Sequence, residues 1–142
     1  FCAHDILGLG ELGKRLLTKA EDVMRTEELP IIPEDMNLGK AIIDVSKGKL
    51  GMGVSLDSDN RVVGLITDGD IRRAMEKWQA RFFDHTVSEI MTRTPKIVSP
   101  STKVTEILRV MHQYKIHSVL VCDREKHLLG IVDSYAASLL NQ

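Results

Sequence analysis

The sequence is poor in the residues that mark several large classes of protein. Its 142 residues include two cysteines, Cys2 and Cys122, which are too few for a disulfide framework, and only 4% are aromatic. No apolar run approaches the about 18 residues that a membrane span requires. The net charge of −1 gives no basic surface for nucleic acid or acidic membranes. The composition indicates a globular protein, and the cysteine usage favours a reducing, cytoplasmic setting.

The chain contains an internal repeat. Residues 50–67 (LGMGVSLDSDNRVVGLIT) and residues 116–133 (IHSVLVCDREKHLLGIVD) share one pattern: an apolar run, Asp, a polar turn, an apolar pair, Gly and a second apolar run. Their offset is 66 (116 − 50), and residues 21–25 match residues 88–92 at an offset of 67. A repeat of this length indicates two copies of one supersecondary unit.

Each copy combines a helical pattern with a hairpin pattern. Four apolar residues in each copy have the i, i+3, i+4, i+7 spacing of a helix face. The two apolar runs that follow are separated by polar turn residues, which predicts two strands joined in a hairpin. We expect closing helices over residues 69–79 and 134–141. The helical positions are Leu38, Ala41, Ile42 and Val45 in the first copy and Val104, Ile107, Leu108 and Met111 in the second.

The repeat predicts an α+β fold of two βαββα units related by pseudo-two-fold symmetry, with their sheets packed around a central cleft. The first unit is expected over residues 20–79 and the second over 87–142. The segment 80–86 between them follows Trp78 and contains Phe82 and Phe83. A flexible linker has few aromatic residues, so we expect this segment to pack across the module or at an oligomer contact.

The most informative local motif is Thr67-Asp68-Gly69-Asp70, at the predicted junction of a strand and a helix. Thr67 can cap the helix, and Asp70 lies in its first turn, where a carboxylate is electrostatically favoured. The same hydroxyl and carboxylate could instead hold the two hydroxyls of a ribose, with Arg72 or Arg73 on a phosphate. The motif alone leaves both interpretations open. In the second copy Asp133 and Ala136 replace Thr67 and Asp70.

The motifs Met91-Thr92-Arg93-x-Pro95 and Gly64-x-x-Thr67-x-x-Asp70 make the chain resemble a tandem pair of cystathionine-β-synthase (CBS) domains, or Bateman module. Such pairs sense adenosine or other nucleotides and regulate an attached protein. The stretches LGKRLL (12–17) and TDGDIRR (67–73) resemble more closely the C-terminal half of D-arabinose 5-phosphate isomerases. Those enzymes join a sugar-isomerase domain to a CBS pair and convert ribulose 5-phosphate to arabinose 5-phosphate, on the route to Kdo in lipopolysaccharide and capsule.

This resemblance implies that the whole protein is an aldose–ketose isomerase and that residues 1–19 are a linker from a sugar-isomerase domain absent from this chain. We expect no catalytic residue, no metal site and no required cofactor here. The expected ligand is CMP or CMP-Kdo by the logic of feedback, with AMP or ATP as the generic alternative. The expected partners are the attached isomerase domain and a second CBS pair in a homodimer, with no nucleic acid and no membrane.

Nine residues are predicted to line the nucleotide site. Thr67 and Asp70 would hold the ribose. The base would lie near the three apolar residues of the set, and the arginines, the lysine or the histidine would contact the negative charge of the ligand. Two members have simpler explanations: Met52 as a core residue, and His117 as a polar residue at a strand edge. The full set is Thr67, Asp70, Arg72, Arg73, Met52, Lys49, Ile31, Pro30 and His117.

Two other functions stay open at this point. The module could be a ligand-free oligomerisation unit, or it could be the CBS pair of another enzyme or signalling protein. A Gly8-x-Gly10-x-x-Gly13 pattern also matches the dinucleotide-binding fingerprint. That fingerprint requires a preceding strand and a parallel βαβ sheet, whereas the repeats predict hairpins, so we do not favour it.

Overall fold

The computed structural model describes residues 17–48 and 50–134, which form two compact units. Neither unit is one continuous stretch. The segment that opens the first sequence copy packs in the unit formed mainly by the second copy, and the segment that opens the second copy packs in the unit formed mainly by the first. The α5 unit contains residues 17–27, 96–124 and 129–134, and the α3–α4 unit contains residues 28–48, 50–95 and 125–128.

The α3–α4 unit is built on an antiparallel hairpin, as the sequence predicts. In its register Met52 lies opposite Thr67 and Val54 opposite Leu65. Ile31 extends the sheet by a parallel bridge to Val54, and Thr92 by an antiparallel bridge to Leu65. Its elements are α3 (Leu38–Lys47), β1 (Met52–Leu56), β2 (Val62–Thr67), α4 (Asp68–Trp78) and the 3-10 helices η1 (Gln79–Asp84) and η2 (Val87–Glu89).

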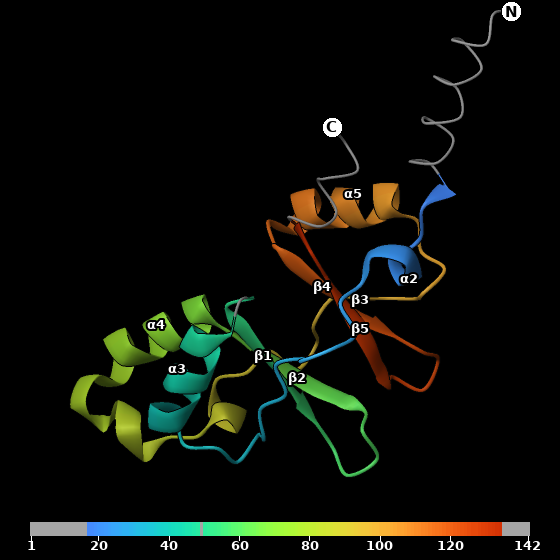
Figure 1. Ribbon diagram of the computed structural model, residues 1–142. Helices are drawn as coiled ribbons and strands as arrows, with labels where there is room; N and C mark the ends of the chain where they lie inside the picture. The colour runs from blue at the N-terminus through green and yellow to red at the C-terminus, as the bar shows by residue number, and fades with distance from the viewer. Residues whose placement is uncertain (1–16, 49, 135–142) are drawn as a thin grey trace, which may run out of the picture. The chain divides into compact units, whose positions relative to one another are not determined.

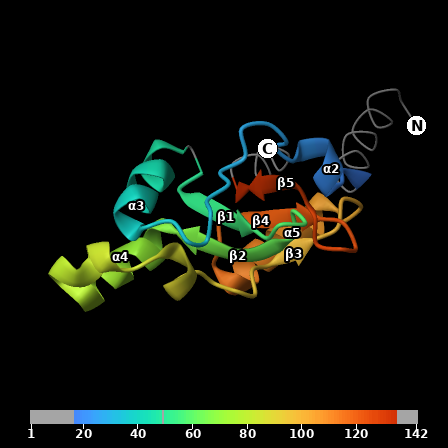
Figure 2. The same cartoon turned by 90° about the horizontal axis from the view of Figure 1, so that it is seen from below.

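The helices α3 and α4 lie side by side, and η1 contacts both of them. On the hairpin, α3 contacts β1 and α4 contacts β2 (Figures 1 and 2). Their buried residues follow the helical spacing that the sequence shows, because one face of each helix lies against the core. Asn37 begins α3 as its N-cap, its side chain accepting from the Gly39 N–H at 2.7 Å. The core comprises Ile32, Leu38, Ala41, Val45, Ile66, Ile71, Ala74, Phe82, Val87 and Met91.

The aromatic segment after α4 belongs to this unit. Phe82 is 1% exposed and fills the core, whereas Phe83 is 59% exposed. The Asn37 side chain donates from Nδ2 to the Phe83 carbonyl at 2.6 Å, which fixes η1 to the start of α3. The segment is therefore a packed part of the fold rather than a flexible linker.

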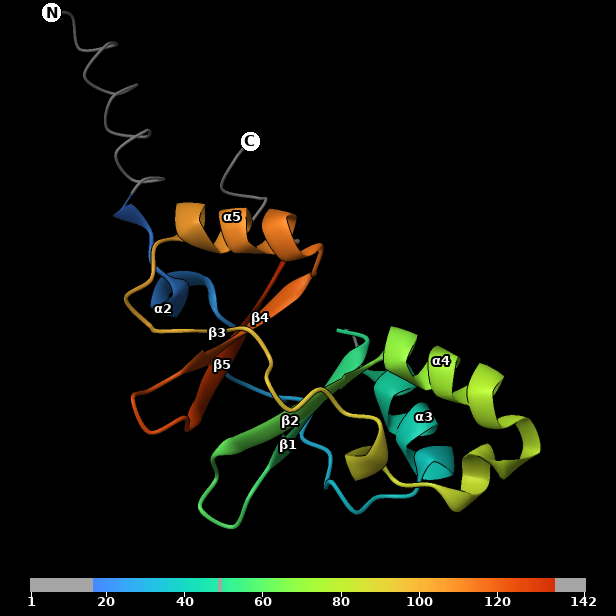
Figure 3. The same ribbon diagram turned by 180° about the vertical axis from the view of Figure 1, so that it is seen from behind.

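The α5 unit has a three-stranded sheet in the order β3-β4-β5, with β3 parallel to β4. Ala20, from the start of the described chain, lies in its core together with residues of α5. Figures 1 and 3 show this: blue α2 lies beside the orange and red elements. The elements are α2 (Ala20–Val23), β3 (Ile97–Val98), α5 (Val104–Tyr114), β4 (Ser118–Cys122) and β5 (Leu128–Asp133).

The sequence repeat is also a repeat of main-chain hydrogen bonds. Leu65 and Thr92 exchange two bonds, of 2.9 and 2.8 Å, in the α3–α4 unit. Ile131 and Arg25 exchange two, of 3.0 and 2.8 Å, in the α5 unit. The partners are related by offsets of 66 (131 − 65) and 67 (92 − 25), the offsets read from the sequence. The α+β architecture of two similar units is thereby confirmed.

The repeated glycine has a structural cause. A Cβ atom on Gly130 would lie 2.7 Å from the Met24 sulfur and 2.8 Å from the Arg25 carbonyl oxygen. A Cβ atom on Gly64 would lie 2.8 Å from Met91 Cγ. Each glycine therefore leaves room for a methionine that crosses the strand, and each methionine lies in the segment that opens a sequence copy.

Two expected elements fall largely outside the described residues: the linker at residues 1–19 and the closing helix over residues 134–141. Cys122 is buried at 2% exposure. Within residues 17–48 and 50–134, no helix has both the length and the apolar character needed to cross a bilayer.

Candidate functional site

The junction of β2 and α4 is closed by a capping box made by Thr67 and Asp70. The Thr67 hydroxyl accepts from the Asp70 N–H at 3.2 Å. Asp70 Oδ2 in turn accepts from the Thr67 N–H at 3.0 Å. Two main-chain donors that the helix cannot satisfy itself are thus paired. The capping interpretation of this motif is observed in the structure, and both predicted ribose ligands take part in it.

Arg73 lies one turn further along α4 and pairs with the same carboxylate. Its Nη2 lies 2.5 Å from Asp70 Oδ1, where the Asp70 side chain is 13% exposed and the Arg73 side chain 70%. An exposed arginine of this kind can change rotamer at little energetic cost. Arg72 is exposed. The structure thus brings one of the two predicted phosphate-binding arginines to the carboxylate.

The turn before β1 faces the same junction. Gly51 has a positive φ of 64°, and its carbonyl accepts from the Asp68 N–H at 3.1 Å. A side chain there would be strained, and its Cβ would lie 2.7 Å from the Asp68 carboxylate. The glycine therefore allows the turn to approach the start of α4 closely.

Three predicted apolar contacts lie on the sheet of this unit. Met52 is opposite Thr67 in the hairpin register and is 3% exposed, so its side chain belongs to the packed interior. The Pro30 carbonyl accepts from the Val54 N–H at 2.8 Å, and Ile31 next to it is 45% exposed. Ile31 is thus the apolar member that is open to solvent.

The two remaining predicted residues are Lys49 and His117. Lys49 lies outside the described residues. His117 is an exposed residue of the α5 unit, and its carbonyl accepts from the Ser134 N–H at 2.7 Å. That bond repeats the Asp68–Gly51 bond at an offset of 66 (117 − 51), in agreement with the sequence alignment of His117 and Gly51.

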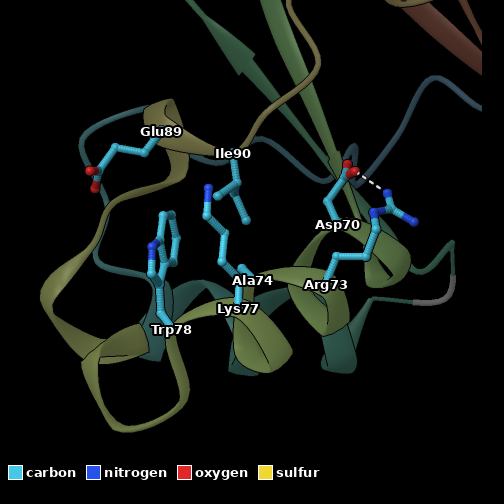
Figure 4. A pocket seen from close by; sticks show the side chains of 7 residues that line it. All are labelled: Asp70, Arg73, Ala74, Lys77, Trp78, Glu89 and Ile90. Carbon is cyan, nitrogen blue, oxygen red and sulfur yellow. Dashed lines mark hydrogen bonds and ion pairs between the residues drawn. The ribbon is translucent and has the colours of Figure 1, made fainter.

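A pocket of about 230 Å³ lies beside this junction, between one face of α4 and the segment that contains η2 (Figure 4). The Asp70–Arg73 pair is at one end and the Trp78 ring at the other, with Lys77 and Ile90 between them. The lining residues are Asp70, Arg73, Ala74, Lys77, Trp78, Glu89 and Ile90.

The Trp78 end of the pocket is held by a second capping box. Glu89 Oε2 accepts from the Thr86 N–H at 2.7 Å, and Glu89 Oε1 lies 2.9 Å from His85 Nδ1. The His85 ring stacks on Trp78 with centroids 3.6 Å apart. The hydrogen bond to His85, with that from Thr86, lowers the pKa of the Glu89 carboxyl from its ordinary 4.5.

The sequence analysis did not identify this pocket. Thr86-x-x-Glu89 has the capping-box spacing and could have located the short helix. The spacing of Asp70, Arg73, Lys77 and Trp78 places them on one helix face, but no local pattern says that Ile90 covers that face. Among the described residues, no group of three or more His, Cys, Asp or Glu could hold a metal ion.

The model of the CBS domain family matches residues 20–77 and 87–135. The chain belongs to the CBS domain family. The match covers both sequence copies, so the chain is a CBS pair.

The CBS pair is similar to two curated arabinose 5-phosphate isomerases. It is 38% identical over 127 residues to KdsD of Francisella tularensis, covering 87% of this chain and 37% of that protein. It is 32% identical over 123 residues to KpsF of Escherichia coli O6:H1, again covering 87% and 37%. The chain therefore spans about 37% of the length of these relatives, and the resemblance to that isomerase family is confirmed.

A solved structure has the same fold. The CBS domain pair of protein MJ0100, in complex with 5′-methylthioadenosine and S-adenosyl-L-methionine, superposes with a TM-score of 0.77 and 26% identity, covering 88% of this chain and 96% of that one.

Proposed function

We propose that this CBS pair senses a nucleotide or nucleotide-sugar and regulates an arabinose 5-phosphate isomerase domain to which it is attached. The observation that carries the proposal is the 38% identity to KdsD, a protein of which this chain spans 37%. The larger part of that relative lies outside the aligned region, which leaves room for an isomerase domain. The coupling would act through a change in how the CBS pair packs on that domain.

The chemistry of the β2–α4 junction supports a ribose ligand. Asp70 uses one lone pair of Oδ2 for the Thr67 N–H and one of Oδ1 for Arg73. Each carboxylate oxygen has a second lone pair, so the group can still accept from two ribose hydroxyls. Thr67 keeps a hydroxyl proton to donate. The exposed Arg73 guanidinium could turn from Asp70 to a ligand phosphate, a role in which arginine is favoured.

The MJ0100 structure supports a nucleoside as the ligand class, because both of its ligands are adenosine derivatives. The resemblance to isomerases of the Kdo pathway favours instead CMP or CMP-Kdo, as products that would act in feedback. AMP and ATP are the generic alternatives. In either case the base would contact the apolar surface near Ile31, which is 45% exposed.

The test is a thermal-shift titration of the 142-residue chain with CMP, CMP-Kdo, AMP and ATP. Ligand at about 100 Kd stabilises the folded state by about 2.7 kcal/mol. The informative variant is Asp70→Asn, because its side-chain oxygen can still cap Thr67 while the charge is lost. Asp68→Asn is the matched control: it removes an exposed carboxylate from the same helical turn.

We expect a shift with at least one nucleotide, a loss of about tenfold or more in affinity in Asp70→Asn, and none in Asp68→Asn. Equal affinity in the Asp70 variant would disprove the ribose role. A cytidine-selective shift would support feedback from the Kdo pathway.

One observation favours a second function, the assembly of CBS pairs. Ile43 on α3, Met75 on α4 and Phe83 on η1 are 52%, 40% and 59% exposed, and the three elements are in mutual contact. If no nucleotide shifts the melting temperature and light scattering gives a dimer, the module is an oligomerisation unit instead.

A further inference from the structure

The pocket between α4 and η2 carries a chemistry that the ribose site does not use. Asp70, Arg73, Ala74, Lys77 and Trp78 have the i, i+3, i+4, i+7, i+8 spacing of one helix face, and all five line it. Asp70 stands at the end shared with the ribose site. Lys77 is seven residues further on, about 10 Å along the axis at 1.5 Å per residue. The Trp78 end is therefore a separate locus.

The charges that line the pocket leave one cation available. The Asp70 carboxylate is paired with Arg73 at 2.5 Å. The Glu89 carboxylate is engaged by His85 at 2.9 Å and by the Thr86 N–H at 2.7 Å. Within the described part of the chain, no carboxylate lies within salt-bridge distance of the Lys77 ammonium, which lies 5.2 Å from the Trp78 ring centroid. In the part of the chain that the structure describes, Lys77 is thus a cation without a carboxylate partner beside an aromatic ring.

The remaining surface of the pocket suits hydroxyl groups and carbon-bound hydrogens. Each oxygen of Glu89 keeps a lone pair after its present bonds, and its side chain is 45% exposed, so it can accept from a ligand hydroxyl. Ala74, Ile90 and Trp78 supply the apolar contacts. The volume of about 230 Å³ is below the range of about 300–1,000 Å³ typical for drug-sized ligands. It fits a molecule smaller than a whole nucleotide.

We propose that this pocket, which we call the Trp78 pocket, binds a small anionic polyol, with the anionic group on Lys77, hydroxyls on Glu89 and a carbon face on Trp78. A phosphorylated sugar and a sugar acid share this chemistry. The site differs from the nucleotide site in its residues, apart from Asp70 and Arg73 at the shared end, and in the size of its ligand. The proposal does not depend on the identity of the nucleotide.

Trp78 makes the test direct, because it is the only tryptophan of the 142 residues. The intact chain is titrated with ribose 5-phosphate, gluconate, neutral ribose and inorganic phosphate, with excitation at a wavelength that only tryptophan absorbs. Isothermal calorimetry gives the affinity independently of the fluorescence amplitude. We expect saturable binding of ribose 5-phosphate or gluconate, and the ratio of the two distinguishes phosphate from carboxylate recognition.

Lys77→Gln removes the charge and keeps most of the side chain. The loss of a charged hydrogen bond should lower the affinity by about tenfold or more. Lys40→Gln, the same change at an exposed position of α3 that does not line the pocket, should leave affinity unchanged. Circular dichroism melts check that both variants fold.

Three results would overturn the proposal. Equal binding of neutral ribose and ribose 5-phosphate would exclude a role for the charge. Inorganic phosphate binding as tightly as the charged sugars would exclude recognition of the polyol, and the absence of saturable binding by either charged sugar would exclude the site itself. The nucleotide thermal shift should persist in Lys77→Gln. The nucleotide assay tests Asp70 and the sugar titration tests Lys77, so either proposal can be refuted while the other stands.

Discussion

The replacement of Asp70 by alanine should destabilise the protein before any ligand is considered. The variant loses the Asp70 Oδ2 acceptor for the Thr67 N–H, a bond of 3.0 Å, and a negative charge in the first turn of α4. A hydrogen bond of this kind contributes about 0.5–1.5 kcal/mol net, and a first-turn carboxylate about 0.3–1 kcal/mol. The pair with Arg73 adds about 0–1 kcal/mol, because the arginine is 70% exposed.

The sum to expect for Asp70→Ala is about 1–2 kcal/mol, since these contributions overlap. Urea unfolding followed by circular dichroism measures it, and Arg73→Gln isolates the ion pair. Thr67→Ala should cost about 1 kcal/mol. The double variant should cost less than the sum of the two single variants, because both residues close one capping box. An unchanged urea midpoint in Asp70→Ala, or strict additivity, would refute the cap as a stabilising unit.

Two further predictions concern η1 and η2. Phe82→Ala should lower the free energy of unfolding by about 3–5 kcal/mol, because Phe82 is 1% exposed. Phe83 is 59% exposed, so Phe83→Ala should lower it far less; urea titrations of both variants measure the difference. Glu89 has a pKa lowered chiefly by His85, so its contribution to stability is present above the ordinary value of 4.5 and is lost as the pH falls through its folded pKa. Glu89→Gln should therefore reduce the loss of stability measured on acidification below about pH 4.5, and an unchanged acid profile would contradict this.

The fold could be predicted from the sequence because its local patterns agree with the repeat. The spacing of Leu38, Ala41 and Val45 predicted a helix with one buried face, and the three side chains are 0%, 0% and 1% exposed. The hairpin over β1 and β2 followed from two apolar runs around a polar turn. The turn is built on the Asp57 carboxylate, which accepts from the N–H groups of Asp59 at 2.8 Å and Arg61 at 2.9 Å.

The composition of the compact units could not be predicted in the same way. Residues 20–27 open the first sequence copy, yet Ala20 lies in the core of the α5 unit, and Arg25 pairs with Ile131. Such long-range pairing depends on side-chain fit, here the methionine that crosses Gly130, rather than on propensity or period. The Trp78 pocket was missed for the same reason: Ile90 and Glu89 reach α4 only through tertiary packing.

Comparison of the two copies bears on why Asp70 is present. In both copies a main-chain bond joins the residue that follows the second hairpin strand to the residue before the first: Asp68 N–H to the Gly51 carbonyl, and Ser134 N–H to the His117 carbonyl. The second copy has Ala136 where the first has Asp70. The main-chain part of the junction therefore does not depend on the carboxylate, which in the first copy adds a cap and an ion pair. The Asp70→Asn variant keeps an acceptor for the Thr67 N–H and removes the charge, so it separates the cap from the charge. If it keeps stability but loses nucleotide affinity, the carboxylate charge serves the ligand; if it keeps both, the cap alone accounts for Asp70.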